Sequence, residues 1–219
     1  MEKTTLKTLA YNTIKNKIVS CEYAPGMFLT EEQLKAELKI SKTPIRDALI
    51  RIQEEGLVEL KSKVGITVKP LTMRDINMCF EIRMLYEPYI LEQYGSYLNE
   101  EVLEGYYQSF CLPGTDLDII SEKDYYQLDS DFHQMLIEAC PNHYIKRTYA
   151  LIQTQSERFR YMTGNESSAR LQDSFKEHCQ IISACLQKDW NEASRQMLHH
   201  LKESKRTTFE LAFNNMINM

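Results

Sequence analysis

An aspartate and three histidines in the second half of the chain have the residue types and the spacing of a metal site. Asp129 and His133 are four residues apart, so on a helix they lie on one face. His178 and His200 each lie in an apolar stripe of helical spacing, and such stripes face a core. One carboxylate and three imidazoles from three helices could supply four ligands to a divalent metal.

The same residues also have a purely structural interpretation. A histidine on an apolar face is usually a core residue whose ring nitrogens form hydrogen bonds within the protein. Asp129 fits this interpretation less well, because a buried carboxylate needs a partner. From the residues alone, both interpretations stay open.

The segment that begins at Ser41 has the chemistry of a DNA-reading helix. Ser41 and Thr43 can donate hydrogen bonds to phosphate oxygens, while Lys42 and Arg46 can neutralise phosphates or reach a guanine edge. A recognition helix presents such side chains from its first turn, where free N–H groups also favour anions. A capped surface helix with scattered charges is the alternative, and the neighbouring elements favour DNA binding over it.

Those neighbouring elements predict a winged helix-turn-helix domain over residues 1–70. Thr30 and Gln33 have the spacing of a capping box, and Gly56 follows the last apolar residue of the third helix. After Gly56 the pattern changes to short β-prone runs, which predict a two-stranded wing. The expected helices cover about residues 5–21, 30–39 and 41–55, and the expected strands cover 57–60 and 66–68.

Residues 71–219 are expected to form an all-helical domain, so the fold class is mainly α. The pattern predicts an antiparallel bundle of six or seven helices with short connections. Its first helix begins at Thr72 and is expected to be interrupted at Pro88, and its last covers about 191–213. Candidate helix N-caps between them are Asn99, Ser121, Asn142 and either Ser167 or Ser168.

Charge and composition add two expectations. The net charge of the 219 residues is −5, but residues 1–70 carry 12 Lys/Arg and 9 Asp/Glu, a net charge of +3. We therefore expect residues 1–70 to be the part of the chain that meets phosphates. The six cysteines are scattered without a CxxC pair, which favours reduced thiols. No long apolar run or signal peptide is visible, so we expect a cytoplasmic protein with no membrane partner.

Residues 9–69 resemble the winged-helix domain of GntR-type regulators. The resemblance rests on the pattern Leu-x-x-x-Leu-x-Ile-Ser-x-Thr-Pro-Ile-Arg-x-Ala-Leu from Leu34 to Leu49, with Gly56-Leu57-Val58 after it. In that family the residues matching Ser41, Lys42, Thr43 and Arg46 contact DNA, and the wing tip enters the minor groove.

Two departures from the GntR pattern affect this expectation. Glu32 stands where many members have a basic residue, and Val64 precedes the wing glycine where arginine is common. Wing contacts would then come from Lys61, Lys63 and Gly65.

Residues 72–212 resemble the ligand-binding domain of the FadR/FCD branch of that family. The motifs that carry the resemblance are Asp129-x-x-x-His133, Asn142-His143-Tyr144-Ile145, Glu177-His178-x-x-Ile181 and Met197-x-x-His200-Leu201. The resemblance implies a divalent metal, with zinc, nickel and manganese as candidates. Many members hold it through the residues matching Asp129, His133, His178 and His200.

Such a site would leave one or two coordination positions for an effector. A carboxylate oxygen of a small organic acid suits them, and a guanidinium can bind the second oxygen. Arg83 occupies the place where the family has an arginine near the cavity. Further candidates for effector contacts are Tyr126, Arg158 and Tyr161.

The expected function is therefore a ligand-responsive transcriptional repressor rather than an enzyme. We expect a homodimer that binds a double-stranded, pseudopalindromic DNA operator, with operator affinity controlled by a small carboxylate effector. Two alternatives are a regulator that senses the metal directly and a helical metallohydrolase fused to a DNA-binding head.

Overall fold

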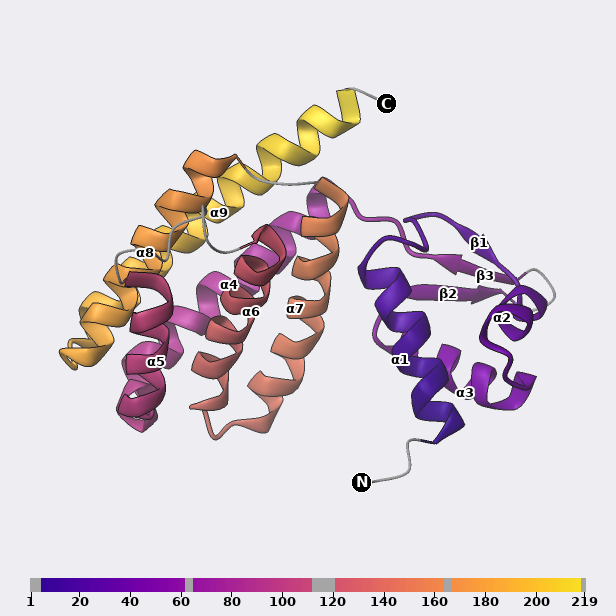
Figure 1. Cartoon of the computed structure of the whole chain (residues 1–219), viewed down its shortest axis with the longest axis horizontal. Coiled ribbons are helices and arrows are strands. Elements are labelled where there is room, and N and C mark those ends of the chain that lie inside the picture. Colours follow the sequence, from indigo (N-terminus) through magenta and orange to yellow (C-terminus); the bar gives the residue numbers. More distant parts are fainter. Residues whose placement is uncertain (1–4, 62–64, 112–120, 164–166, 218–219) are drawn as a thin grey trace. The chain divides into compact units, whose positions relative to one another are not determined.

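The computed structural model describes residues 5–61, 65–111, 121–163 and 167–217 (Figure 1), and its contacts divide the chain into two compact units. The first unit contains residues 1–72 together with 157–162, and the second contains 73–156 together with 163–219. Within the described residues, no helix combines the length and the apolar character needed to cross a membrane.

Three helices form most of the first unit: α1 (Leu6–Val19), α2 (Glu31–Leu38) and α3 (Lys42–Glu54). The turn between α2 and α3 contains Lys39, whose left-handed φ of 55° ends α2. The apolar sides of the three helices share one core with the small sheet. Buried members of this core are Ile14, Leu34, Ile45 and Val58.

The sheet of the first unit has three strands where a two-stranded wing was expected. Strands β2 (Val58–Lys61) and β3 (Gly65–Val68) are antiparallel, as the hairpin prediction requires. The additional strand β1 (Phe28–Leu29) pairs with the other edge of β3, in the order β1-β3-β2. The two residues of β1 are too few to show a strand period, so only their pairing with a distant strand identifies them.

The close contact between β1 and β3 also explains the glycine at the start of β3. Gly65 has a φ of +140°, and a Cβ added there would lie 2.3 Å from the Phe28 ring. Gly65 therefore has a structural reason to be glycine, whatever its part in DNA binding.

The capping box at the start of α2 leads to a prediction about stability. The Thr30 hydroxyl accepts a hydrogen bond from the Gln33 backbone N–H, and the Gln33 side chain accepts one from the Thr30 N–H. Thr30→Ala is expected to lower the free energy of unfolding by about 1 kcal/mol, because a helix N–H loses its partner. Ser41 is the N-cap of α3 but forms no side-chain cap hydrogen bond, so Ser41→Ala is a matched control with a smaller expected loss. Equal losses in urea unfolding followed by circular dichroism would contradict this explanation.

The described part of the second unit consists of helices, as expected, and Figure 1 shows α8 and α9 lying side by side within it. Helix α9 packs along both α4 and α8, and α5 packs on α8. A short 3₁₀ turn, η1 (Gly95–Tyr97), follows α4. The α-helices are α4 (Met73–Tyr94), α5 (Glu100–Cys111), α6 (Glu122–Glu138), α7 (His143–Thr163), α8 (Ser168–Leu186) and α9 (Trp190–Ile217).

The predicted interruption at Pro88 is wrong, because α4 continues through it to Tyr94. Proline has no N–H to donate and clashes with the preceding turn, which costs roughly 3 kcal/mol in a helix interior. Pro88 is buried, as are Glu87 and Ile90 of the same helix, and α4 packs along α9 and α6. Tertiary packing therefore outweighs the local preference of proline.

Candidate metal centre and nucleic-acid interface

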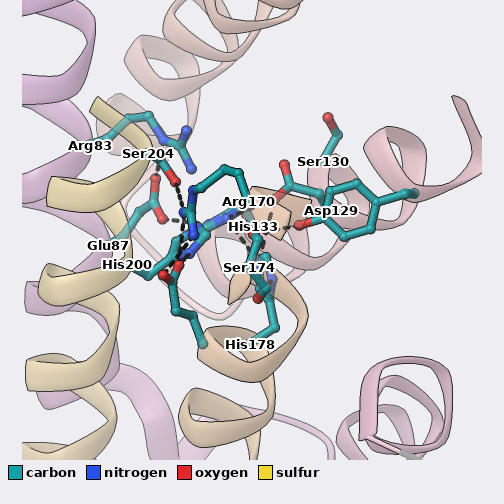
Figure 2. A network of polar contacts seen from close by, with 12 residues as sticks. Arg83, Glu87, Asp129, Ser130, His133, Arg170, Ser174, His178, His200 and Ser204 are labelled. Carbon is teal, nitrogen blue, oxygen red and sulfur yellow. Dashed lines mark hydrogen bonds and ion pairs between the residues drawn. The ribbon is translucent and has the colours of Figure 1, made fainter. Parts of the chain in front are cut away.

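The structure brings together the four potential ligands of the second unit. Helix α6 supplies Asp129 and His133, α8 supplies His178 and α9 supplies His200, and all four residues are buried. One potential donor atom from each residue lies within 4.8 Å of the donor atoms of the other three. Figure 2 shows these side chains gathered at one place, with Glu87 and Arg170 beside them.

The distances between donor atoms have the scale of a coordination sphere. His178 Nε2 lies 3.4 Å from Asp129 Oδ1 and 3.5 Å from His133 Nε2. His133 Nε2 lies 3.7 Å from the same Asp129 oxygen. Ligands held ~2.1 Å from one ion are separated by roughly 3.0–3.4 Å in octahedral and tetrahedral sites. An ion would therefore draw these atoms only slightly closer together.

The outer nitrogen of each histidine already has a partner. His133 Nδ1 lies 2.6 Å from Glu87 Oε2, and His200 Nδ1 lies 2.7 Å from Glu177 Oε2. His178 Nδ1 lies 2.8 Å from the Ser174 carbonyl oxygen. Each partner accepts a hydrogen bond, which assigns the proton to Nδ1 and leaves a lone pair at Nε2.

Two arginines hold the glutamates that orient His133 and His200. Arg83 Nε donates to Glu87 Oε1 at 2.7 Å, and the Tyr149 hydroxyl donates to the same oxygen at 2.7 Å. Arg170 binds Glu177 through both terminal nitrogens, at 2.7 and 2.9 Å. The centre therefore has two relays of the same kind, each running from histidine to glutamate to arginine.

Burial and neighbouring charges set the protonation of the histidines. Burial, reinforced by His200, holds the pKa of His178 well below its ordinary value. Burial also lowers the pKa of His200, against its hydrogen bond to Glu177. Both imidazoles are neutral at pH 7. Burial disfavours the charged form of His133 as well, but the Glu87 carboxylate outweighs burial and raises the pKa of His133.

The two glutamates that orient the histidines are both ionised. Burial alone would raise the pKa of Glu87, but Arg83 and His133 hold it well below its ordinary range. Burial alone would raise the pKa of Glu177 as well, but hydrogen bonds from His200 and Arg170 lower it. Each glutamate is therefore a charged acceptor for the Nδ1 of its histidine.

The donor set fits a borderline divalent metal. Imidazole nitrogens suit zinc and nickel, and the single carboxylate oxygen also suits manganese. The convergence of Nε2 lone pairs favours a cation as well, because two acceptors facing each other at 3.5 Å repel.

The candidate effector residues are not all at this centre. Arg83 is buried beside it and bonds Glu87 through Nε. Tyr126 on α6 is half-buried against the core of the second unit. Arg158 is buried and Tyr161 exposed, both in the 157–162 segment of α7 that groups with the first unit.

Sequence reasoning did not assign the residues that orient the histidines. Glu87 lies one helical turn after Arg83, and Glu177 adjoins His178, so both had local signals. Arg170 lies two turns before Glu177 on α8, and a pair of opposite charges at that spacing does not by itself predict a contact. Tyr149 had no signal, because its partner is on another helix.

At the start of α3, the proposed DNA-contacting side chains reach the surface. Ser41, Thr43 and Arg46 are exposed and Lys42 is half-buried, whereas Pro44 and Ile45 point into the core. The two basic side chains form ion pairs with α2: Lys42 with Glu32, and Arg46 with Glu31.

The wing is described only in part. Lys61 at the end of β2 is exposed, and its Nζ lies 3.5 Å from a Glu59 carboxylate oxygen. Gly65 begins β3 against Phe28. Lys63 lies outside the described residues.

Comparison with known families matches each part of the chain separately. The family described as "Bacterial regulatory proteins, gntR family" matches residues 6–68, and the family described as "FCD domain" matches residues 79–203. The second match alone covers more than half of the chain.

Two relatives match over most of this chain and most of their own length. The HTH-type transcriptional repressor RspR of Escherichia coli is 25% identical over 193 residues, covering 88% of this chain and 84% of that protein. The Nta operon transcriptional regulator of Aminobacter aminovorans is 26% identical over 186 residues, covering 84% and 86%.

Solved structures show the same fold. A GntR transcriptional regulator from Rhodococcus matches with a TM-score of 0.75 at 15% identity, covering 92% of this chain and 96% of that one. Escherichia coli McbR/YncC matches with the same TM-score and identity, covering 95% and 99%.

Proposed function

The chain belongs to the GntR family of bacterial transcriptional regulators, in the branch with an FCD domain, and we propose that it is a repressor controlled by a small carboxylate bound at a metal centre. The family and the relatives are regulators, not enzymes, so the metallohydrolase alternative is not carried further.

On the DNA side, the proposed reader is the first turn of α3. Lys42 and Arg46 are basic, Ser41 and Thr43 are exposed donors, and all four begin a helix whose other face is core. Wing contacts are assigned to Lys61, Lys63 and Gly65. Two copies of the chain would address the half-sites of a pseudopalindromic operator as a homodimer.

The observation that carries the sensing proposal is that Asp129, His133, His178 and His200 lie together, with each ring held by an acceptor at Nδ1. A divalent ion held by Asp129, His133, His178 and His200 would supply a Lewis-acidic position for an anionic oxygen. The chain itself fixes the tautomers of the three rings, and it keeps the four metal-binding side chains buried before a metal or an effector binds.

Metal coordination and hydrogen bonding both favour a carboxylate as the effector. A divalent cation would attract an anionic oxygen to an open coordination position. Arg83 uses only Nε for Glu87, and its terminal nitrogens have no hydrogen-bond partner among the residues that the structure describes. We infer that those nitrogens bind the effector's carboxylate in the forked geometry that arginine favours.

The test is a panel of small mono-, di- and hydroxycarboxylates added to the full-length, metal-loaded protein. We expect at least one of them to raise the thermal unfolding temperature and to release a DNA operator obtained by selection from a random duplex library. Arg83→Lys keeps the charge but not the fork, so it should retain the metal and lose the carboxylate response. If the metal alone releases the operator and no acid changes that release, the chain is a direct metal sensor and the effector proposal is wrong.

A further inference from the structure

Both basic side chains at the start of α3 are already bound to carboxylates at the start of α2. Lys42 forms an ion pair with Glu32, and Arg46 Nε donates to Glu31 Oε1 at 2.7 Å. The side chains of Lys42 and Glu32 are 42% and 67% exposed, so this pair can exchange partners with an incoming ligand. The side chains of Arg46 and Glu31 are 61% and 30% exposed.

Helix stability explains why two glutamates stand at the start of α2, but it does not explain which residues they contact. Glu31 and Glu32 follow the N-cap Thr30, where negative charge stabilises a helix start. Hydrogen bonds from Arg46 and Lys42 lower the pKa values of Glu31 and Glu32 respectively, so both are ionised at neutral pH. Helix stability does not require that they reach the two cations of the next helix.

The pairing cancels the charge of that part of the proposed DNA surface which the first turns of α2 and α3 form. Residues 1–70 carry an excess of three positive charges, since 12 Lys/Arg stand against 9 Asp/Glu. At the first turns of α2 and α3, however, two carboxylates cancel two cations. Binding to DNA without regard to sequence depends on neutralising phosphates, so a surface without net charge gains little from it.

We propose that Glu31 and Glu32 are specificity-determining residues, whose carboxylates occupy Arg46 and Lys42 until a DNA offers base contacts as well as phosphates. The proposal rests on the proposed function, which assigns Lys42 and Arg46 to DNA. On a non-specific duplex, Lys42 and Arg46 only exchange a carboxylate partner for a phosphate. The carboxylates of Glu31 and Glu32 then lie close to the negatively charged DNA backbone. An operator adds hydrogen bonds to base edges, which compensate for the broken ion pairs.

The test compares a selected operator with a scrambled duplex of equal length, using the full-length chain and fluorescence anisotropy over a range of salt. Glu32→Gln should tighten binding to the scrambled duplex by about tenfold at low salt, because one more phosphate is neutralised. Binding to the operator should tighten less, so the ratio of the two affinities falls. The slope of log affinity against log salt on the scrambled duplex should steepen by about one.

Glu54→Gln is the matched control, because Glu54 is an exposed residue at the other end of α3 and the change in net charge is the same. Equal effects of Glu32→Gln and Glu54→Gln, or no effect of Glu32→Gln on the scrambled duplex, would overturn the proposal. Lys42→Ala and Arg46→Ala separate its failure from that of the proposed function. If they leave operator binding unchanged, the assignment of α3 to DNA is wrong; if they weaken it while Glu32→Gln changes nothing, only the specificity proposal is wrong.

Discussion

His178→Ala is expected to remove the metal from the purified protein. The His178 ring is fully buried, its Nε2 lies 3.4 Å from Asp129 Oδ1, and its Nδ1 is held by the Ser174 carbonyl. Loss of a partner that only orients a metal-bound histidine already costs roughly 10–100-fold in metal affinity, and loss of the ligand itself should cost more. Metal content per chain, measured by mass spectrometry after gel filtration, should fall from stoichiometric to trace.

His199→Ala is the matched control for this experiment. His199 adjoins His200 on α9 but is exposed, so its replacement should leave the metal content unchanged. Circular dichroism would check that the His178 variant is folded. If wild-type protein loaded with zinc, nickel or manganese retains no metal, or if the folded His178→Ala variant retains as much as wild type, the four residues form a hydrogen-bonded core and the metal proposal is wrong.

Glu87→Ala is expected to give the largest loss of stability of any replacement considered. Glu87 is fully buried and accepts hydrogen bonds from Arg83 and Tyr149, with His133 Nδ1 at 2.6 Å. Its removal leaves a buried arginine without its counter-charge, which costs about 3–5 kcal/mol in free energy of unfolding. Trp190, the single tryptophan of the chain, begins α9, so its fluorescence during urea unfolding reports on the second unit.

Two further variants make that measurement specific. Glu81→Ala changes an exposed glutamate of the same helix and should alter the free energy of unfolding by less than about 0.5 kcal/mol. Glu87→Gln keeps the side-chain volume and one acceptor oxygen, so its loss of free energy of unfolding should fall between those of Glu87→Ala and Glu81→Ala. Similar values for Glu87→Ala and Glu81→Ala would mean that the relay from His133 to Arg83 contributes little to stability.

The parts of the fold that could be predicted are those whose signals are local. The capping box of Thr30 and Gln33 is visible within four residues, and the structure has it. By contrast, the spacing of apolar residues in α1 does not show which of them are buried, since Leu6 and Leu9 are 58% and 46% exposed. Ala10 takes the buried position instead, one turn before Ile14, because apolar spacing alone does not say which of two overlapping stripes meets a core.

The candidate site divides in the same way. The spacing of Asp129 and His133 follows from one helix, and so does that of Arg83 and Glu87. The contact of Glu87 with His133 joins α4 to α6, and its contact with Tyr149 joins α4 to α7. No spacing in the sequence encodes which helices are neighbours, so the orienting residues become visible only when the helices are assembled.

Pro88 gives α4 a particular mechanical property. Because proline has no N–H, the carbonyl of Met84 lacks its usual partner in the helix ladder, and the backbone is less resistant to bending there than anywhere else along α4. Pro88 lies next to Glu87 and one turn beyond Arg83. A ligand that changes the forces on either side chain would therefore act on α4 where its backbone bends most readily.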